Sequence, residues 1–167
     1  DQDTDDDGLS DGEEVLTPLL DTRWVQGPSG DYYRFAPEAA SWSSSSGSAW
    51  NAGYGLASLH SSTEARWLFD TFGHVSDGFW IGLNDWSVPG QYTWADGSTV
   101  TYTQWATGEP DPSQSPGGVF VGGPNSGEPG NWYTELYGSS DRLAVWQSSG
   151  PNAPMTARDP LNWDSDG

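Results

Sequence analysis

The sequence predicts an α+β fold with two helices, small antiparallel sheets and one long loop. Strand and helix patterns alternate along residues 24–104, whereas residues 111–140 are rich in turn residues and show no periodicity. A dense acidic run fills the beginning of the chain. A length of 167 residues allows one ordinary domain and a small appendage, so we place a boundary between residues 1–23 and residues 24–167.

The composition excludes several functions. There are 24 acidic against 5 basic residues, and a formal charge of −19 repels phosphate backbones and anionic lipid, so we expect no nucleic acid or membrane partner. No apolar stretch approaches the ~18 residues of a membrane span. The chain has no cysteine, hence no disulfide or thiol nucleophile. His60 and His74 have no catalytic spacing, and we expect no enzyme.

Two helices are expected in the first half of the larger domain. A short strand over residues 32–35 comes first, followed by a weak helical pattern over residues 39–53. Four serines and Gly47 make this first helix a poor one by itself, so packing must hold it. The second helix begins at a capping box, Ser61 to Glu64, and ends near Gly73. Its apolar face is formed by Ala65, Leu68, Phe69 and Phe72.

Strands dominate the second half. Residues 79–83 are an apolar run typical of a buried strand. Residues 91–94 and 99–102 flank Asp96-Gly97, which predicts a hairpin. Residues 142–146 are the last expected strand.

The acidic run matches an EF-hand-like calcium loop position by position. Glycine stands at the sixth position, where the chain must turn, and a glutamate closes the twelfth. Calcium prefers six to eight oxygen ligands at this spacing. The alternative is a solvated acidic tail, but Gly8 and Glu14 in register favour calcium. The expected ligands are Asp3, Asp5, Asp7, Leu9 through its carbonyl, Asp11 and Glu14.

Residues 1–23 also resemble a thrombospondin type 3 repeat, through the string Asp-Thr-Asp-Asp-Asp-Gly-Leu-Ser-Asp-Gly-Glu-Glu. The resemblance implies a calcium-stiffened extracellular spacer. It therefore implies a secreted or cell-surface protein.

From about Asp31 to Trp163 the chain resembles the C-type lectin-like domain, in a cysteine-free, bacterial type. The order of five motifs carries the resemblance, and they are Tyr32–Phe35 with Trp42, Gly55–Leu59, Trp80-Ile81-Gly82-Leu83, Gly90–Trp94 with Asp96-Gly97-Ser98, and Trp105 with Gly108–Asp111. It implies the C-type lectin-like fold. It also implies a strand that closes the sheet on the first strand, and we expect this strand to be missing before Gly167.

The resemblance implies a second calcium ion in the long loop, where it also holds two sugar hydroxyls. Glu109 and Asp111 flank Pro110, in the place of the family's Glu-Pro-Asn or Gln-Pro-Asp tripeptide with its usual cis-proline. Glu-Pro-Asp is a hybrid of the two and indicates neither mannose-type nor galactose-type sugars. The remaining implied ligands are Asp141 beside Ser140, and Asp164 and Asp166 near Trp163-Asp164-Ser165 in the Trp-Asn-Asp position. A secondary site would use Asp85, but Pro89 and Pro112 stand where carboxylates are expected.

Eleven tryptophans indicate either an aromatic core or sugar-stacking surfaces. Trp80, Trp94 and Trp105 are assigned to the core, and Trp146 to either role. Trp132 and Trp163 are candidate sugar platforms. For Trp132 an equal alternative is a plug that anchors the loop.

These observations favour a calcium-dependent carbohydrate-binding or adhesion module of a secreted or cell-surface protein, with a glycan or a protein surface as ligand. The alternative is a structural lectin-like subunit of an extracellular appendage, in which calcium provides rigidity only. In that case self-assembly or a partner chain would complete the open sheet.

Overall fold

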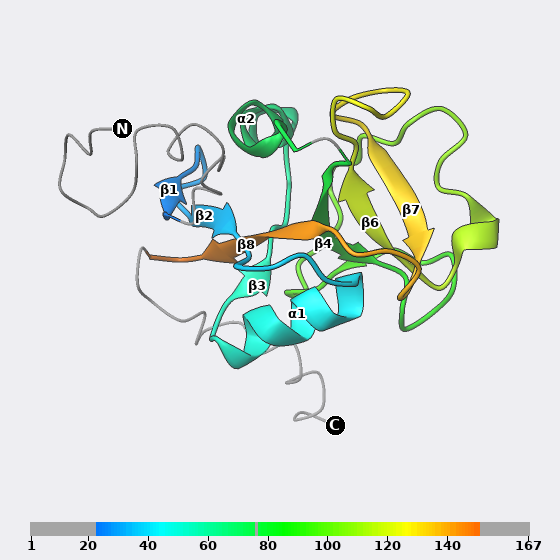
Figure 1. The fold of residues 1–167 in the computed structure, drawn as a ribbon, viewed down its shortest axis with the longest axis horizontal. Coiled ribbons are helices and arrows are strands. Elements are labelled where there is room, and N and C mark those ends of the chain that lie inside the picture. Colours follow the sequence, from blue (N-terminus) through cyan, green and yellow to red (C-terminus); the bar gives the residue numbers. More distant parts are fainter. Residues whose placement is uncertain (1–22, 76, 151–167) are drawn as a thin grey trace, which may run out of the picture.

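The structure, a computed structural model, describes residues 23–75 and 77–150 (Figure 1). The acidic loop Asp3 to Glu14 lies outside the described residues, as do Trp163, Asp164 and Asp166. The elements are β1 (Val25–Gln26), β2 (Tyr32–Phe35), α1 (Trp42–Asn51), β3 (Gly55–Leu56), α2 (Ser62–Phe72), β4 (Phe79–Asn84), β5 (Thr93–Trp94), the 3-10 helix η1 (Pro112–Gln114), β6 (Gly117–Val121), β7 (Trp132–Leu136) and β8 (Leu143–Ser148).

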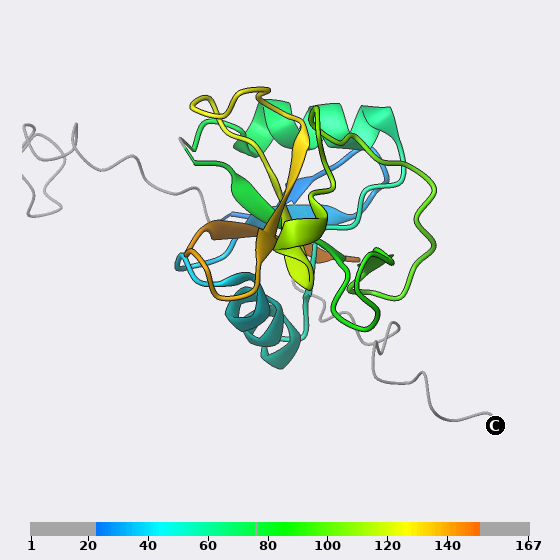
Figure 2. The ribbon, with the colours of Figure 1, turned by 90° about the vertical axis from the view of Figure 1, so that its right-hand side faces the viewer.

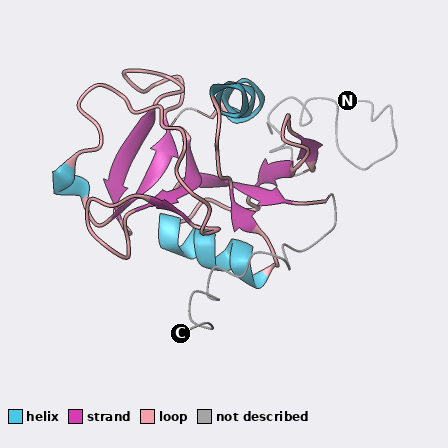
Figure 3. Ribbon diagram, turned by 180° about the vertical axis from the view of Figure 1, so that it is seen from behind, coloured by secondary structure: helices cyan, strands magenta, loops and turns pink. Residues whose placement is uncertain are grey.

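The strands form one sheet in the order β1-β2-β8-β4-β6-β7, with β3 paired to β8 and β5 to β4. The pairs are antiparallel except for β4 and β8, which run parallel, so the sheet is mixed and not purely antiparallel as expected. The two helices lie on opposite sides of it, α2 above and α1 below in Figure 1, and Figure 3 shows the same layers from behind. The predicted α+β class is confirmed. No described helix is long and apolar enough to span a membrane.

The expectation that the closing strand is missing is wrong. All four residues of β2 pair with β8, from Tyr32 opposite Ser148 to Phe35 opposite Val145. The last strand expected from the sequence is therefore itself the closing strand. Its central place beside β4 explains its apolar residues.

Both helices are held as the sequence predicts. Ser61 accepts a hydrogen bond from the Glu64 amide at 3.2 Å, and the Glu64 carboxylate accepts the His60 amide at 2.7 Å. The apolar face of α2 packs on one core cluster, while α1 packs on a second across the sheet. In α1 the Trp42 indole donates to the Ile81 carbonyl at 2.7 Å, which ties the weak helix to β4.

Two predictions about strands are wrong. Residues 99–102 form no strand, because Asp96 accepts the amide and hydroxyl of Ser98 and directs the chain away from β5. Residues 111–140 contain β6 and β7 and are only partly loop. The glycines of β6 weaken its strand signal in the sequence. Glycine is needed at position 118 because a Cβ there would lie 2.3 Å from the Trp42 ring.

Candidate functional site

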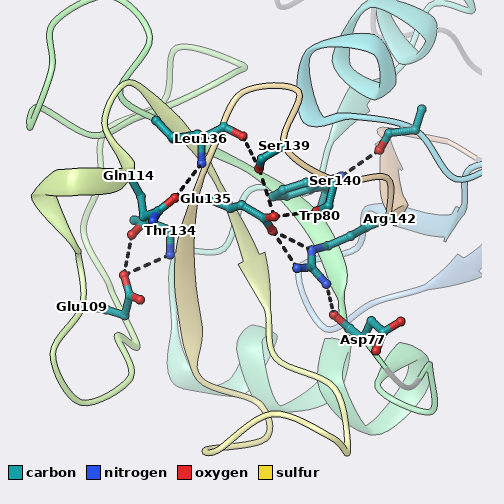
Figure 4. A network of polar contacts seen from close by, with 11 residues as sticks. Asp77, Trp80, Glu109, Gln114, Thr134, Glu135, Leu136, Ser139, Ser140 and Arg142 are labelled. Carbon is teal, nitrogen blue, oxygen red and sulfur yellow. Dashed lines mark hydrogen bonds and ion pairs between the residues drawn. The ribbon is translucent and has the colours of Figure 1, made fainter.

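A long loop connects β5 and β6 (Figure 2). It places Glu109 against β7 (Figure 4). Glu109 Oε2 accepts the Thr134 amide at 3.0 Å, the Thr134 hydroxyl at 2.5 Å and the Asp111 amide at 2.9 Å. The Glu109-Pro110 peptide is cis, as the resemblance implies. The Asp111 amide also donates to the Thr134 hydroxyl oxygen at 3.0 Å, while the Asp111 carboxylate accepts the Ser113 amide at 2.8 Å. Both residues are therefore fastened to the outer strand of the sheet, Glu109 through its carboxylate and Asp111 through its backbone.

This contact also covers a strand edge. The outward amides of β7 belong to alternate residues, Trp132, Thr134 and Leu136. They are bonded to the Gln104 carbonyl at 2.7 Å, to Glu109 and to the Gln114 side chain at 3.3 Å. Unpaired edge amides invite pairing with another chain. Glu109 therefore also stabilises the edge of the sheet, besides any role in binding.

The surroundings of the loop are electronegative. Burial raises the pKa of Tyr92 to about 12, and the negative charges of Asp85, Glu109 and Asp111 add to the shift. The Tyr92 phenol therefore stays protonated at neutral pH and remains a hydrogen-bond donor. Hydrogen bonds from Ser113 lower the pKa of Asp111, which stays ionised.

Asp85, which the sequence offered to a secondary calcium site, is fully buried and already bonded within the protein. Its oxygens accept the Gly90 amide at 2.7 Å, the Gly117 amide at 2.6 Å and the Ser115 hydroxyl. Three protein donors thus take the place that a cation would need. Asp85 joins the end of β4 to two loops.

Asp141 is not brought to Glu109. It is exposed, and its neighbours Ser140 and Arg142 contact Glu135 (Figure 4). Successive side chains of a strand point to opposite faces, so Glu135 lies across β7 from Thr134 and Glu109. The Arg142 guanidinium is 2.6 Å from Glu135 and 3.9 Å from the Phe120 ring centroid.

The described residues do not fit a calcium ion of the implied kind. Calcium prefers six to eight oxygens, whereas residues 105–116 of this loop offer only the carboxylates of Glu109 and Asp111. Within residues 23–75 and 77–150 no group of three or more His, Cys, Asp or Glu is placed to hold a metal. Asp164 and Asp166, outside these ranges, stay predictions.

The prediction of Trp132 as a sugar platform is wrong, because its side chain is 0% exposed. Its ring meets those of Trp94, Tyr102 and Trp105 at centroid distances of 5.8–6.0 Å. The alternative role, an aromatic plug under the loop, fits these contacts. The core assignments of Trp80 and Trp94 are confirmed, Trp105 is partly buried against the core, and Trp146 is buried too.

Within residues 23–75 and 77–150, the tryptophans with large exposed fractions are ones that the sequence analysis does not single out. Trp50 is 40% and Trp86 62% exposed. A usable signal was present for Trp86, since it stands in a turn-rich segment directly after the buried strand β4.

Comparison with known proteins decides the family. The sequence profile of the lectin C-type domain matches residues 38–136, more than half of the chain. This chain belongs to the lectin C-type domain family. The family is a non-enzymatic, carbohydrate-binding one, which confirms that the chain is not an enzyme.

Relatives of this lectin C-type domain match in part. C-type mannose receptor 2 of Rattus norvegicus is 35% identical over 82 residues, 49% of this chain and 6% of that protein. The alpha-N-acetylgalactosamine-specific lectin of Patiria pectinifera is 44% identical over 64 residues, 36% of this chain and 38% of that lectin. The chain thus spans less than two fifths of the length of either relative.

Solved structures share the fold. The cow carbohydrate-recognition domain of CD23, studied in the presence of GlcNAc2Man3 oligosaccharide, has a TM-score of 0.65 at 26% identity, covering 79% of this chain and 95% of its own. A calcium-independent type II antifreeze protein has a TM-score of 0.64 at 21% identity, covering 80% and 94%. At that identity the second likeness shows the fold alone.

The family match also bears on the Trp-Asn-Asp position. It ends at Leu136, far before Trp163. The segment that meets Glu109 in this lectin C-type domain is Trp132-Tyr133-Thr134. It keeps the tryptophan but has neither asparagine nor aspartate, so no third carboxylate faces Glu109 from β7.

Proposed function

We propose that this lectin C-type domain, of the cysteine-free, bacterial type, binds carbohydrate as a module of a secreted or cell-surface protein. The observation that carries the proposal is the position of the Glu109 carboxylate, which Thr134 and the Asp111 amide hold at the edge of β7. The relatives named as lectins and the neighbour studied with an oligosaccharide support it. Adhesion is included in this proposal, because a module that binds a glycan on another surface would use the same site.

The loop offers acceptors for sugar hydroxyls. The described hydrogen bonds of Glu109 all end on Oε2, so Oε1 has no partner among the described residues. A carboxylate oxygen accepts stronger hydrogen bonds than a neutral one. A hollow of about 250 Å³, lined by Tyr92, Pro110 and neighbouring residues, lies at this loop. It is below the roughly 300–1,000 Å³ of drug-sized sites and suits a single sugar ring.

We propose that calcium binds outside the sugar site. Two carboxylates are too few for an ion in the lectin loop, so we place calcium in the acidic loop Asp3 to Glu14, where it stiffens the preceding segment. Calorimetric titration of the full chain with calcium tests this. We expect one site, lost in Glu14→Gln. An unchanged calcium heat in that variant would place the ion elsewhere.

Glycan-array binding of the full chain tests the sugar site. The double variant Glu109→Gln with Asp111→Asn removes both charges, while the glutamine oxygen can still accept the Thr134 amide. Loss of even one charge-assisted hydrogen bond, about 1.5–3 kcal/mol, weakens binding roughly tenfold or more. Glu128→Gln is a matched control, because Glu128 stands in the second Gly-Glu-Pro triplet of the chain. Its carboxylate bonds Thr107 and Asn131 and not β7.

Two outcomes would count against the proposal. Equal binding by the double variant and by Glu128→Gln would remove the site from Glu109. Absence of any bound glycan, with calcium or with a chelator, would favour the structural alternative. The argument for that alternative from an open sheet no longer applies, since β8 closes the sheet on β2 without a partner chain.

A further inference from the structure

A groove of about 560 Å³ lies on the α1 side of the molecule, away from Glu109 and Asp111. It is formed by α1, by β3 and by the segments that flank β5. Its volume falls within the roughly 300–1,000 Å³ of small-ligand sites. Trp50 at the end of α1 and Trp86 after β4 both line it. They are among the few large apolar side chains exposed in the described chain, besides Val88 and Leu136.

The exposed Trp86 is held in place. Its ring meets Tyr137 at a centroid distance of 4.4 Å and an angle of 72°. Its amide donates to the Asn84 side chain at 3.2 Å, and the Asn84 amide group in turn donates to the Gly82 and Thr93 carbonyls. A tryptophan that stays 62% exposed on such a rigid base is preorganised to bind at little entropic cost.

The chemistry of the groove selects a neutral ligand. None of the residues that line it is charged, although the chain carries a formal charge of −19. Besides the aromatic side chains, the lining includes four residues with aliphatic hydroxyl groups, and they are Ser46, Ser87, Thr93 and Ser98. Aromatic faces with a few polar groups match a sugar ring, which has apolar C–H faces and a rim of hydroxyls.

We propose that this groove is a second binding site, which takes a neutral oligosaccharide stacked on Trp50 and Trp86. It shares no lining residue with the hollow beside Tyr92 and Pro110. The two sites are therefore independent, and a chain with both can hold two parts of one glycan or two glycans.

The sequence of α1 fits this role. Gly47 lies within α1 and lines the groove, although glycine is less favourable than alanine in the interior of a helix. No close packing requires it, because a Cβ at Gly47 would meet no atom within 4 Å. The small side chains at Ser46 and Gly47 leave the groove open on the side formed by α1. A longer side chain at Gly47 would enter open space without disturbing the core.

The experiment follows the indole N–H signals of Trp50 and Trp86 by nuclear magnetic resonance on the full chain. The signals are identified with Trp50→Phe and Trp86→Phe. Cellotetraose, maltotetraose and mannotetraose are the neutral probes, and a galacturonic acid tetramer is the charged one. We expect both signals to move with at least one neutral probe at millimolar concentration, and not with the charged one.

Variants separate this site from the first. Aromatic stacking contributes about 0.5–1.5 kcal/mol per contact, so Trp50→Ala and Trp86→Ala should each weaken binding about two- to tenfold. Gly47→Gln should weaken it without loss of thermal stability. Glu109→Gln with Asp111→Asn should leave it unchanged. Failure of the first site alone would leave these results intact.

Three results would overturn the inference. The first is no movement of either indole signal with any neutral probe. The second is full binding by Trp50→Ala and Trp86→Ala together. The third is equal or tighter binding of the charged tetramer.

Discussion

Asp85→Asn measures how strongly one buried carboxylate organises the loops around the proposed sugar site. The replacement keeps the shape of a side chain that is 0% exposed, and it turns one acceptor oxygen into an NH₂ donor. In one orientation this NH₂ faces the Gly117 amide, and in the other it faces the Gly90 amide. At least one donor is left unsatisfied, at about 1–3 kcal/mol, and the remaining hydrogen bonds lose their charge. We expect a loss of about 2–4 kcal/mol in the free energy of unfolding.

Urea unfolding followed by near-ultraviolet circular dichroism gives this number. The melting temperature should fall by roughly 4–16 °C, at about 2–4 °C per kcal/mol for a chain of this size. Ser115→Ala is the matched control. It removes one donor and leaves the carboxylate with two amides, so we expect a smaller loss of about 1 kcal/mol. An Asp85→Asn protein as stable as the wild type would refute the reasoning, because burial of the charge would then cost as much as its hydrogen bonds contribute.

Three further substitutions follow from packing and charge. Gly118→Ala should lower the free energy of unfolding by about 1–3 kcal/mol or more, because its Cβ would lie 2.3 Å from the Trp42 ring. Gly47→Ala should instead raise it by about 0.5–1 kcal/mol, since a Cβ there meets no atom within 4 Å. Urea unfolding compares the two variants, and equal effects would contradict the packing argument. Burial alone would raise the pKa of Glu135, but hydrogen bonds from serines and Arg142, with the charge of Arg142, bring it below its ordinary value. The stability this carboxylate contributes is therefore present above its unfolded pKa of about 4.3 and is lost as the pH falls through its folded pKa. Glu135→Gln should give a flatter dependence of unfolding free energy on pH below about pH 4.5, and an unchanged profile would exclude this role.

The sequence predicts the elements whose local signals agree with their place in the fold. The strand β2, the capping box at Ser61 and the buried strand β4 lie where expected, because each has a local signal: aromatic residues in β2, Ser61 with Glu64 at the start of α2, and an apolar run in β4. The strand β6 lacks such a signal, whereas β7 carries one in Trp132-Tyr133-Thr134 that its turn-rich neighbours obscure. Glycine weakens a strand locally, and only the approach of Trp42 from α1 explains Gly118. Such a contact joins residues far apart in the chain and leaves no local signal.

The candidate site was predictable in its motif but not in its surroundings. Glu109 and Asp111 were found because a tripeptide is local. The partners of Glu109 were not, since Thr134 lies on a strand that was taken for loop. The exposure of each tryptophan depends on sheet register as well, and a shift of one residue moves a side chain to the other face. Trp132 is buried because the register of β7 turns its side chain toward the core, although the turn-rich sequence around it favours an exposed position.

A count of acidic residues overstates the ability of this domain to bind metals. A carboxylate can serve a cation only with oxygens that protein donors have not already taken. Asp85 accepts three donors, Glu109 accepts three on one oxygen, and Glu135 is paired with Arg142 and two serines. Some of these donors are far along the chain, such as Gly117 for Asp85 and Thr134 for Glu109, whereas those of Glu135 lie within seven residues of it. The acidic loop Asp3 to Glu14 lies outside the described residues, and its claim to calcium rests on the spacing of its carboxylates in the sequence. For this reason we propose calcium for the first segment and direct hydrogen bonding of sugar for the second.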